Sequence, residues 1–521
     1  MHSYHQKSRS ENSSPLHENT NEDAPKLSAD APQNASATVP DDPDDSGVKV
    51  ETDPIVAEHG PLLFIEENKI SLNLPALAAK YAQSDLAAYS AKQGIHYRGS
   101  KSEGIWIEQT RSEAMRSVGS FLKTTADQHE VPHLLAKRTP ALAKNILTFV
   151  EGLSPLPAPP SPELMLVPVA NGVLDLSGRE PRLRNYRLDD GFTNKLPWKY
   201  DPQAKCERFL NDLIRPSLPG DDLELLQRDF GRQLVPGNRA QTISIIVGDG
   251  GSGKSVLVSI HERIIGIERV AHLRSKQLTG RFETNALRGK CLAVGKDVAP
   301  DYLNNAGAAM LKSLTGADLV ETEQKYGGKF SMRGTLYVII TANRRPIIAI
   351  QDDGSAWRRR LVVYIFTRTP PDQRMPSFDE VLLREEGAGI FAWYVQGFMK
   401  HKAELEQHGR LVLNEVQQRR VDDLLMESDA QREFLRANVV TGVSTLSVEE
   451  IWQAYSAFAR ERGWRIPSKQ VFCTDLAESM LDLFGVERDN HIMRMGSAVR
   501  GYKGVKFAHD ALCNPNGEVC Q

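Results

Sequence analysis

Short apolar runs alternate with amphipathic stretches in the middle of the chain, from Gln241 to about Phe366. The runs TISIIV, TLYVIITAN and LVVYIF are apolar at nearly every position, which is typical of strands in a sheet that is covered on both faces. The stretches between them repeat with the period of a helix. This alternation predicts an α/β fold whose core, residues 241–370, contains a parallel sheet.

The flanking regions have other patterns. Residues 61–240 are expected to form a mainly helical module, with a short β unit around the turn Asn171-Gly172. Residues 371–427 predict a helical connector, and residues 508–521 a short tail. Residues 428–507 predict a separate α+β domain, in which two amphipathic helices, the second capped by Ser468, precede a β-hairpin. Helix–helix–hairpin is the order of a winged helix, which can bind DNA. Protein docking by such a unit remains an alternative.

The composition is typical of a soluble protein and divides the chain into two regions of opposite net charge. Of 521 residues, 40% are hydrophobic and 25% charged, which is enough apolar surface for folded cores. Residues 1–60 hold 12 acidic and 4 basic residues, so they predict a disordered acidic tail, and the remaining chain carries a net charge of +5. No run approaches the roughly 18 apolar residues of a membrane span, and the five cysteines are scattered. We therefore expect a cytoplasmic protein without a membrane partner, and the basic body permits a nucleic-acid partner.

The segment TISIIV-GDGGSGKS-VLVSIHERIIG carries the most specific motif. It matches G-x-x-x-x-G-K-[ST] in full, after a predicted strand and before a predicted helix. Backbone N–H groups of such a loop surround a polyphosphate, and the helix N-terminus adds positive potential. Lys254 is expected to reach the β and γ phosphates of ATP, and the Ser255 hydroxyl to ligate Mg²⁺. The predicted nucleotide-binding residues are Gly248, Asp249, Gly250, Gly251, Ser252, Gly253, Lys254, Ser255 and Val256.

Two competing motifs are weaker. The loop also spells G-x-G-x-x-G, the fingerprint of a dinucleotide site, but that fingerprint does not require the Lys-Ser that follows. Residues His129 to His133 spell H-E-x-x-H, a zinc-protease motif in which both histidines must lie on one unbroken helix. Pro132 lacks the N–H that this helix would need. The sequence therefore favours ATP with Mg²⁺ and disfavours a zinc enzyme.

Polar residues follow two later apolar runs. Asp297, after KCLAVG, is the candidate acid that holds Mg²⁺ through water and orients the attacking water. It is a single acid preceded by Lys296, and an ordinary turn aspartate is the alternative. Asn343, at the end of TLYVIITAN, is expected to contact the γ-phosphate or the attacking water as a sensor. Lys254, Ser255, Asp297 and Asn343 would then converge on one triphosphate.

Basic residues near the core suggest further contacts. Three consecutive arginines, Arg358 to Arg360, precede LVVYIF, and Arg359 or Arg360 is expected to complete the site of a neighbouring subunit. A basic patch on a strand edge is the alternative. The stretch ETEQKYGGKFSM predicts a hairpin whose tip could contact single-stranded DNA, and the C-terminal hairpin carries a local charge of +4. The predicted DNA-binding residues are Lys325, Tyr326, Lys329, Arg500 and Lys503.

In this order the motifs resemble those of superfamily 3 helicases, in particular the helicase part of phage and plasmid primase-helicases and their poxvirus relatives. The resemblance covers roughly residues 70–505. It rests on NGVLDL, LPWKYDPQAKCERF, GDGGSGKS, MLKSLTGADLVETEQKYGGKF, ITANRRP and WRRRLVVYIF. It implies a P-loop NTPase core of the AAA+-like type that assembles into a hexameric ring and moves along single-stranded DNA, usually 3′→5′. Hairpins before the sensor strand line the pore of such a ring.

Two departures from this family matter. Family members usually have a glutamate, often in an acidic pair, near the position of Asp297, so the rate of hydrolysis is in question. Many are also fused to a primase, whereas this sequence contains no Cys/His cluster, so a primase would be a separate partner. The expected function is an ATP-dependent DNA helicase that acts on single-stranded and forked DNA in replication of a phage, plasmid or prophage. The alternatives are a nucleotide-switched initiator or scaffold with little ATPase activity, and a motor on RNA.

Overall fold

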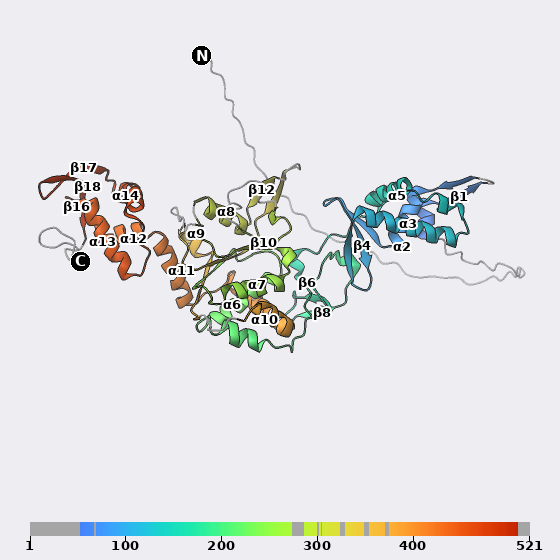
Figure 1. Ribbon diagram of the computed structural model, residues 1–521, viewed down its shortest axis with the longest axis horizontal. Coiled ribbons are helices and arrows are strands. Elements are labelled where there is room, and N and C mark those ends of the chain that lie inside the picture. Colours follow the sequence, from blue (N-terminus) through green and yellow to red (C-terminus); the bar gives the residue numbers. More distant parts are fainter. Residues whose placement is uncertain are drawn as a thin grey trace, which may run out of the picture.

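The computed structural model describes residues 53–66, 69–273, 286–299, 302–303, 305–323, 329–348, 354–369 and 375–508. Three parts follow one another along its long axis. An N-terminal unit lies at one end, the part with the large sheet lies in the middle, and a C-terminal unit lies at the other end (Figure 1).

The N-terminal unit is mixed α/β. Its helices α2, α3 and α5 bury a shared apolar core that includes Leu77, Val118 and Ile146. Helix α3 begins at a capping box, in which Thr110 and Glu113 satisfy each other's backbone N–H groups. Its elements are α1 (Pro54–His59), β1 (Leu63–Glu66), β2 (Lys69–Leu72), α2 (Leu74–Ser84), β3 (Ala87–Ser90), β4 (Ile95–Ser100), β5 (Ile105–Gln109), α3 (Arg111–Gln128), α4 (His133–Ala136) and α5 (Pro140–Leu153).

The region before the large sheet differs from the prediction in its strands and in the residue at which its folded part begins. Residues 61–240 were predicted to be mainly helical, and helices α2, α3, α5 and α6 are the longer elements of its described part, which also contains eight short strands that were not predicted individually, in the sheets β1-β2, β3-β4-β5 and β6-β7-β8. Residues 53–60, assigned to the disordered tail, include helix α1, which Asp53 caps and anchors through an ion pair with Lys80 of α2 (2.5 Å). The strands are only three to six residues long, so each offers few positions from which a strand can be recognised in the sequence.

A small antiparallel sheet connects the N-terminal unit to the core. Val167, Val169 and Leu174 of this sheet belong to the same apolar cluster as the large sheet. Strands β6 and β7 are joined by a turn at Ala170-Asn171, one residue before the predicted Asn171-Gly172, because Gly172 begins β7 and pairs with Val169. The elements are η1 (Pro162–Leu164), β6 (Leu166–Val169), β7 (Gly172–Asp175), β8 (Arg182–Arg184) and η2 (Leu188–Asp190).

The core contains the predicted parallel sheet, with five strands in the order β10-β11-β14-β9-β15. Helices α6, α7 and α10 cover one face, and α8, α9 and α11 cover the other (Figure 1). Strand β9 therefore divides its apolar side chains between both clusters, with Ile246 on one side and Ile243, Ile245 and Val247 on the other. This two-sided burial explains why the strand sequences are almost continuously apolar.

The elements of this core follow in chain order. They are η3 (a π-helical segment, Phe209–Ile214), α6 (Asp222–Gly231), η4 (Arg232–Leu234), β9 (Ile243–Gly248), α7 (Lys254–Ile265), η5 (Ile267–Arg269), β10 (Val270–His272), β11 (Leu292–Gly295), α8 (Asn305–Thr315), β12 (Leu319–Glu323), β13 (Lys329–Arg333), β14 (Tyr337–Ala342), α9 (Gly354–Arg358), β15 (Leu361–Phe366), α10 (Phe378–His408) and α11 (Glu415–Ser428).

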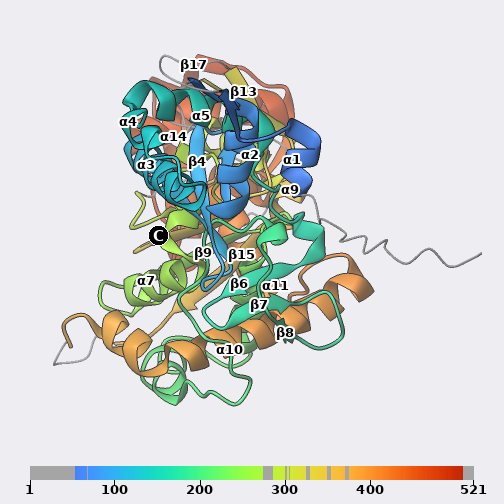
Figure 2. The same cartoon turned by 90° about the vertical axis from the view of Figure 1, so that its right-hand side faces the viewer.

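Helix α10 is part of the core rather than the connector that residues 371–427 were expected to form. It packs against α6 and α7, is seen below β9 and β15 in Figure 2, and contributes Ile390, Phe391 and Tyr394 to the apolar cluster. Glycines allow it to approach α6 closely, since a Cβ on Gly397 would lie 1.9 Å from the carbonyl oxygen of Gln227.

The C-terminal unit joins helices to a three-stranded antiparallel sheet in the order β16-β18-β17. Ser468 caps α14 as predicted, and β17 and β18 form the predicted hairpin. Helix α12 and strand β16 were not predicted. The elements are α12 (Ala430–Asn438), β16 (Val439–Ser447), α13 (Val448–Glu461), α14 (Lys469–Phe484), β17 (Arg488–Arg494) and β18 (Ser497–Phe507).

Candidate functional site

A pocket opens where the glycine-rich loop joins β9 to α7. It has a volume of about 550 Å³, within the range of small-molecule sites. Its lining includes eight of the predicted site residues, which are Gly250, Gly251, Gly253, Lys254, Ser255, Val256, Asp297 and Asn343. The structure therefore brings together, around one cavity, predicted residues that are up to 93 positions apart in the chain.

The conformation of the loop requires glycine at several positions. Gly251 and Gly253 have φ angles of +90° and +100°, a backbone region that other residues rarely adopt. A Cβ on Gly253 would also lie 2.9 Å from Leu213, and one on Gly248 would lie 2.5 Å from the carbonyl oxygen of Phe366. The glycines thus allow the loop to fold tightly against both neighbours at the start of α7.

Lys254 is the first residue of α7, and its ammonium lies inside the loop. It donates hydrogen bonds to the carbonyl oxygens of Gly248 (2.6 Å) and Asp249 (2.9 Å) and to Oδ1 of Asn343 (3.1 Å). Burial lowers the pKa of Lys254, and the nearby carboxylates of Asp297 and Asp249 oppose this shift. The three hydrogen-bond partners are uncharged, so these contacts leave the positive charge of Lys254 without an ion-pair partner within the loop.

The order of the strands explains why Asn343 and Asp297 reach the same pocket. Strand β14 lies between β9 and β11, so the residue that follows it lies between the loop and Asp297. The connection that leaves β9 leads to β10 on one side of the sheet, whereas the connection that leaves β14 leads to β15 on the other. Ligands of open parallel sheets bind at the carboxyl ends of the strands at such a point. Asp297 itself adopts a left-handed backbone, with φ +47°, and its N–H donates to Oγ1 of Thr341 (2.9 Å).

A second wall of the pocket was not predicted. Arg208, Asp212 and Leu213 come from the segment around η3, Arg368 follows β15, and Met375 and Phe378 precede or begin α10. Arg368 donates to the carbonyl oxygen of Asp212 (2.7 Å), which closes this wall. One signal was available in the sequence, because Arg368 follows an apolar strand at the same edge as the loop. The other residues belong to no recognisable motif.

The arginines before β15 lie away from this pocket. They precede the amino end of that strand, whereas the pocket opens at the carboxyl end of the sheet. Arg358 pairs with Asp422 (2.8 Å), and the exposed Arg359 donates to Gln241 (3.3 Å). Arg360 is only 7% exposed and donates to the carbonyl oxygen of Ala356 (3.0 Å). A role for Arg359 or Arg360 in a neighbouring subunit remains a prediction, and exposure favours Arg359.

The predicted DNA-binding residues have different surroundings. Lys325 and Tyr326 lie outside the described residues, and Lys329 begins β13, which pairs with β12 as the expected hairpin requires. Arg500 is exposed on β18, whereas Lys503 forms an ion pair with Asp489 (2.5 Å). DNA contact by these residues remains a prediction.

Helix α14 carries exposed acidic side chains, a feature of the C-terminal unit that was not predicted from the sequence. Its exposed side includes Asp475, Glu478 and Asp482. Burial raises the pKa of Asp475, and the charge of Glu478 adds to this shift. Lys469, on the same helix, forms an ion pair with Glu449. The carboxylates of Asp475 and Glu478 would repel DNA phosphates, so the hairpin is the better candidate for a DNA contact.

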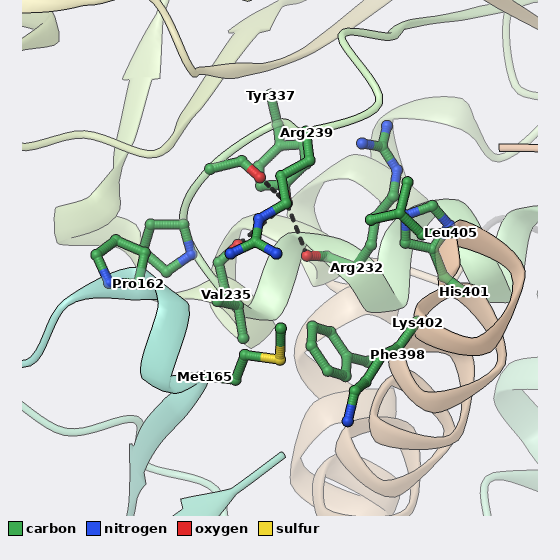
Figure 3. A pocket seen from close by; sticks show the side chains of 12 residues that line it. Pro162, Met165, Arg232, Val235, Arg239, Tyr337, Phe398, His401, Lys402 and Leu405 are labelled. Atoms are coloured by element: carbon green, nitrogen blue, oxygen red, sulfur yellow. Dashed lines mark hydrogen bonds between the residues drawn. The ribbon is translucent and has the colours of Figure 1, made fainter. Parts of the chain in front are cut away.

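Other candidate sites are less suited to a nucleotide. A pocket of about 50 Å³ lies beside Tyr337, which begins β14, and is lined by Met165, Phe398 and Lys402 among others (Figure 3). It is too small for a nucleotide. His129 directly follows α3 and His133 begins α4, so the H-E-x-x-H residues do not share a helix. None of the helices in the described part of the chain combines the length and hydrophobicity of a membrane span.

Comparisons with known proteins identify two matching regions. Residues 76–215 match the family described as "D5 N terminal like", and residues 246–360 match a family of unknown function (DUF5906). The A form apo structure of the NrS-1 C-terminal region is 13% identical, covering 82% of this chain and 99% of that chain, with a TM-score of 0.40. A second apo structure of this region is 12% identical, covering 84% and 100%, with a TM-score of 0.36. The first family match supports the expected relation to phage primase-helicases, whereas membership of superfamily 3 remains a prediction.

Proposed function

We propose that this chain is an ATP-dependent DNA helicase of the superfamily 3 type that acts in replication of a phage, plasmid or prophage. The observation that carries the proposal is the convergence of Lys254, Ser255, Asp297 and Asn343 on one pocket at the carboxyl edge of a parallel sheet. The match of residues 76–215 to the "D5 N terminal like" family supports a role in replication at a coarser level.

The residues present fit Mg²⁺-ATP by their chemistry. Lys254 and the backbone N–H groups at the start of α7 would bind the phosphates. The hydroxyl of Ser255 and, through water, the carboxylate of Asp297 would hold Mg²⁺, which stabilises negative charge on the phosphates when bound. The apolar side chains of Leu213 and Phe378 on the other wall would face the nucleoside.

The same residues suggest how hydrolysis would proceed. Lys254 would exchange its contacts with two backbone carbonyls for the β and γ phosphates. Asp297 would orient the attacking water, and Asn343 would hydrogen-bond the γ-phosphate. Arg359 of an adjacent copy would supply further positive charge, which requires association of at least two copies, as in the hexameric ring that the family resemblance implies. Movement of the β12–β13 hairpin would then displace single-stranded DNA.

The experiment that tests this proposal measures ATP hydrolysis with and without single-stranded DNA, and unwinding of a forked duplex. Lys254→Ala should lower DNA-stimulated hydrolysis by about 100-fold or more, because it removes a group that stabilises developing charge. Lys205→Ala is the matched control, since that lysine is 79% exposed on the surface. If Lys254→Ala still unwinds the fork, the assignment is wrong.

One observation favours a second candidate, a nucleotide-switched initiator or scaffold. The acid at the pocket is a single aspartate on a left-handed backbone, rather than the longer glutamate expected from the family. A wild-type protein that binds ATP and DNA but barely hydrolyses ATP would favour this candidate. Comparison with Asp297→Glu and Asp297→Asn would show whether the acid limits the rate.

A further inference from the structure

Glu262 and Lys296 connect helix α7 to the residue before Asp297. Glu262 lies on α7 and is only 8% exposed, although its side chain is charged. Its Oε2 accepts a hydrogen bond from Nζ of Lys296 (2.8 Å), which immediately precedes Asp297. Its Oε1 is buried, accepts no hydrogen bond from any described residue, and lies 3.6 Å from Nδ1 of His272. A buried carboxylate needs a charged partner, so this contact holds Lys296 against α7.

Asp297 is held from the other side by β14. Its N–H donates to Oγ1 of Thr341, and the N–H of Val298 donates to the backbone oxygen of the same residue (2.9 Å each). These bonds retain a left-handed backbone that is unfavourable for a non-glycine residue. Such a conformation persists only where its surroundings enforce it.

We propose that Glu262 is a positioning residue for Asp297. Through Lys296 it fixes the acid-bearing turn to the helix that begins with Lys254, so that acid and lysine face the same ligand at a constant separation. This inference rests on the proposed function, and it gives Lys296 a role that the motif pattern alone did not suggest. Small misplacements of a reacting group lower rates strongly while binding is retained, because only the reactive geometry is lost.

The test compares Glu262→Gln, Lys296→Met and Lys296→Arg in the full-length chain. Glu262→Gln and Lys296→Met should each lower kcat for ATP hydrolysis by about tenfold, with KM for ATP changed less than about twofold. Lys296→Arg keeps the ion pair and should retain most of the rate. Glu224→Gln is the matched control, because Glu224 forms a comparable but exposed pair with Lys400 (3.4 Å, side chains 64% and 49% exposed).

A second measurement does not depend on activity. Hydrogen exchange of the backbone amides of Asp297 and Val298, followed without nucleotide, should become at least about fivefold faster in Glu262→Gln and in Lys296→Met, since local opening controls exchange. Because Lys296 is 40% exposed, Lys296→Met tests the contact even if the buried substitution unfolds the protein.

The outcomes separate this inference from the proposed function. A wild-type protein without ATPase activity would contradict the helicase proposal, while amide exchange would still decide whether Glu262 positions the turn. Wild-type hydrolysis that depends on Lys254, together with unchanged kcat and unchanged exchange in both variants, would overturn the inference alone. A rise in KM with constant kcat would also overturn it, since that result indicates a binding role.

Discussion

A buried ion pair behind the glycine-rich loop allows a quantitative prediction. Asp229 is fully buried and Arg232 is 3% exposed. Arg232 donates to Oδ1 of Asp229 through Nε (3.0 Å) and Nη2 (2.7 Å). Oδ2 of Asp229 accepts from Ser244 on β9 (2.6 Å) and from Tyr364 on β15 (3.0 Å). The pair therefore joins α6 and η4 to two strands of the sheet, and one of these strands leads into the loop.

Removal of the arginine would leave a buried negative charge. Breaking a buried pair in this way costs about 3–5 kcal/mol. The two hydroxyl donors of Ser244 and Tyr364 remain, so we expect Arg232→Met to lower the free energy of unfolding of the core by about 3 kcal/mol, the lower end of this range. The lost contact between the guanidinium and the ring of Tyr337, 4.8 Å away, adds to the cost (Figure 3).

The assay is urea denaturation followed by hydrogen exchange of peptides from β9 and β15, because these peptides report on the core and not on the terminal units. Asp229→Asn combined with Arg232→Met should be less destabilised than Arg232→Met alone, since the double variant contains no unpaired charge. The reasoning is refuted if Arg232→Met costs less than about 1 kcal/mol, or if the double variant loses as much as the sum of both single variants.

Three further predictions concern pH, packing and assembly. Burial lowers the pKa of His261 from 6.5 to about 3. As the pH drops below 6.5, the unfolded state therefore takes up a proton that the folded state does not bind. The free energy of unfolding then falls by about 1.4 kcal/mol per pH unit. His261→Gln should remove this contribution when unfolding free energies are compared at pH 7 and pH 5. Gly397→Ala should cost about 1–3 kcal/mol in thermal or urea unfolding through overpacking, whereas Gly152→Ala, with open space around it, should not. Arg359→Ala should lower ATP hydrolysis but retain ATP binding. Activity should partly return when this variant is mixed with Lys254→Ala subunits. An Arg359→Ala variant as active as wild type would exclude a role of Arg359 in the site of a neighbouring subunit.

The parallel sheet and one wall of the pocket could be predicted because their signals are local. Strands buried on both faces have continuous apolar sequences, as in Ile243–Gly248 and Leu361–Phe366. The loop motif combines glycines with Lys254, and the positions of Asp297 and Asn343 follow from the rule that strand ends meet at one edge. Each of these inferences needs only a short segment and its neighbours.

The other wall could not be predicted because it depends on tertiary packing. Arg208 and Phe378 are 170 positions apart and belong to no motif, and they meet only because α10 packs against the segment around η3. The short strands of the N-terminal unit were missed for a related reason. In β4, for example, the apolar Ile95 and Tyr97 alternate with polar residues, but the run is only six residues long, and its pairing with β3 and β5 makes it a strand.

Helix α11 shows how charge patterns can hide a structural role. Its sequence, EVQQRRVDDLLMES, has the composition of a solvated connector, yet Arg420 forms a bidentate pair with Asp222 of α6, which is 1% exposed (2.5 and 2.9 Å). A charge of α11 is therefore neutralised by a residue that lies 198 positions earlier in the chain. No local pattern could have indicated this pairing.

The opposite end of α11 is attached to the segment that follows the Asn343 strand. Arg345 forms an ion pair with Glu427 (3.4 Å), and the N–H of Ile348 donates to the hydroxyl of Ser428 (3.1 Å). Helix α12, the first element of the C-terminal unit, begins two residues after α11 ends. The C-terminal unit is thus connected through a helix that is fixed to α6 on one side and to the segment after β14 at its other end. A displacement of Asn343 and the turn behind it would therefore be transmitted to the C-terminal end of α11. A flexible linker could not transmit such a displacement.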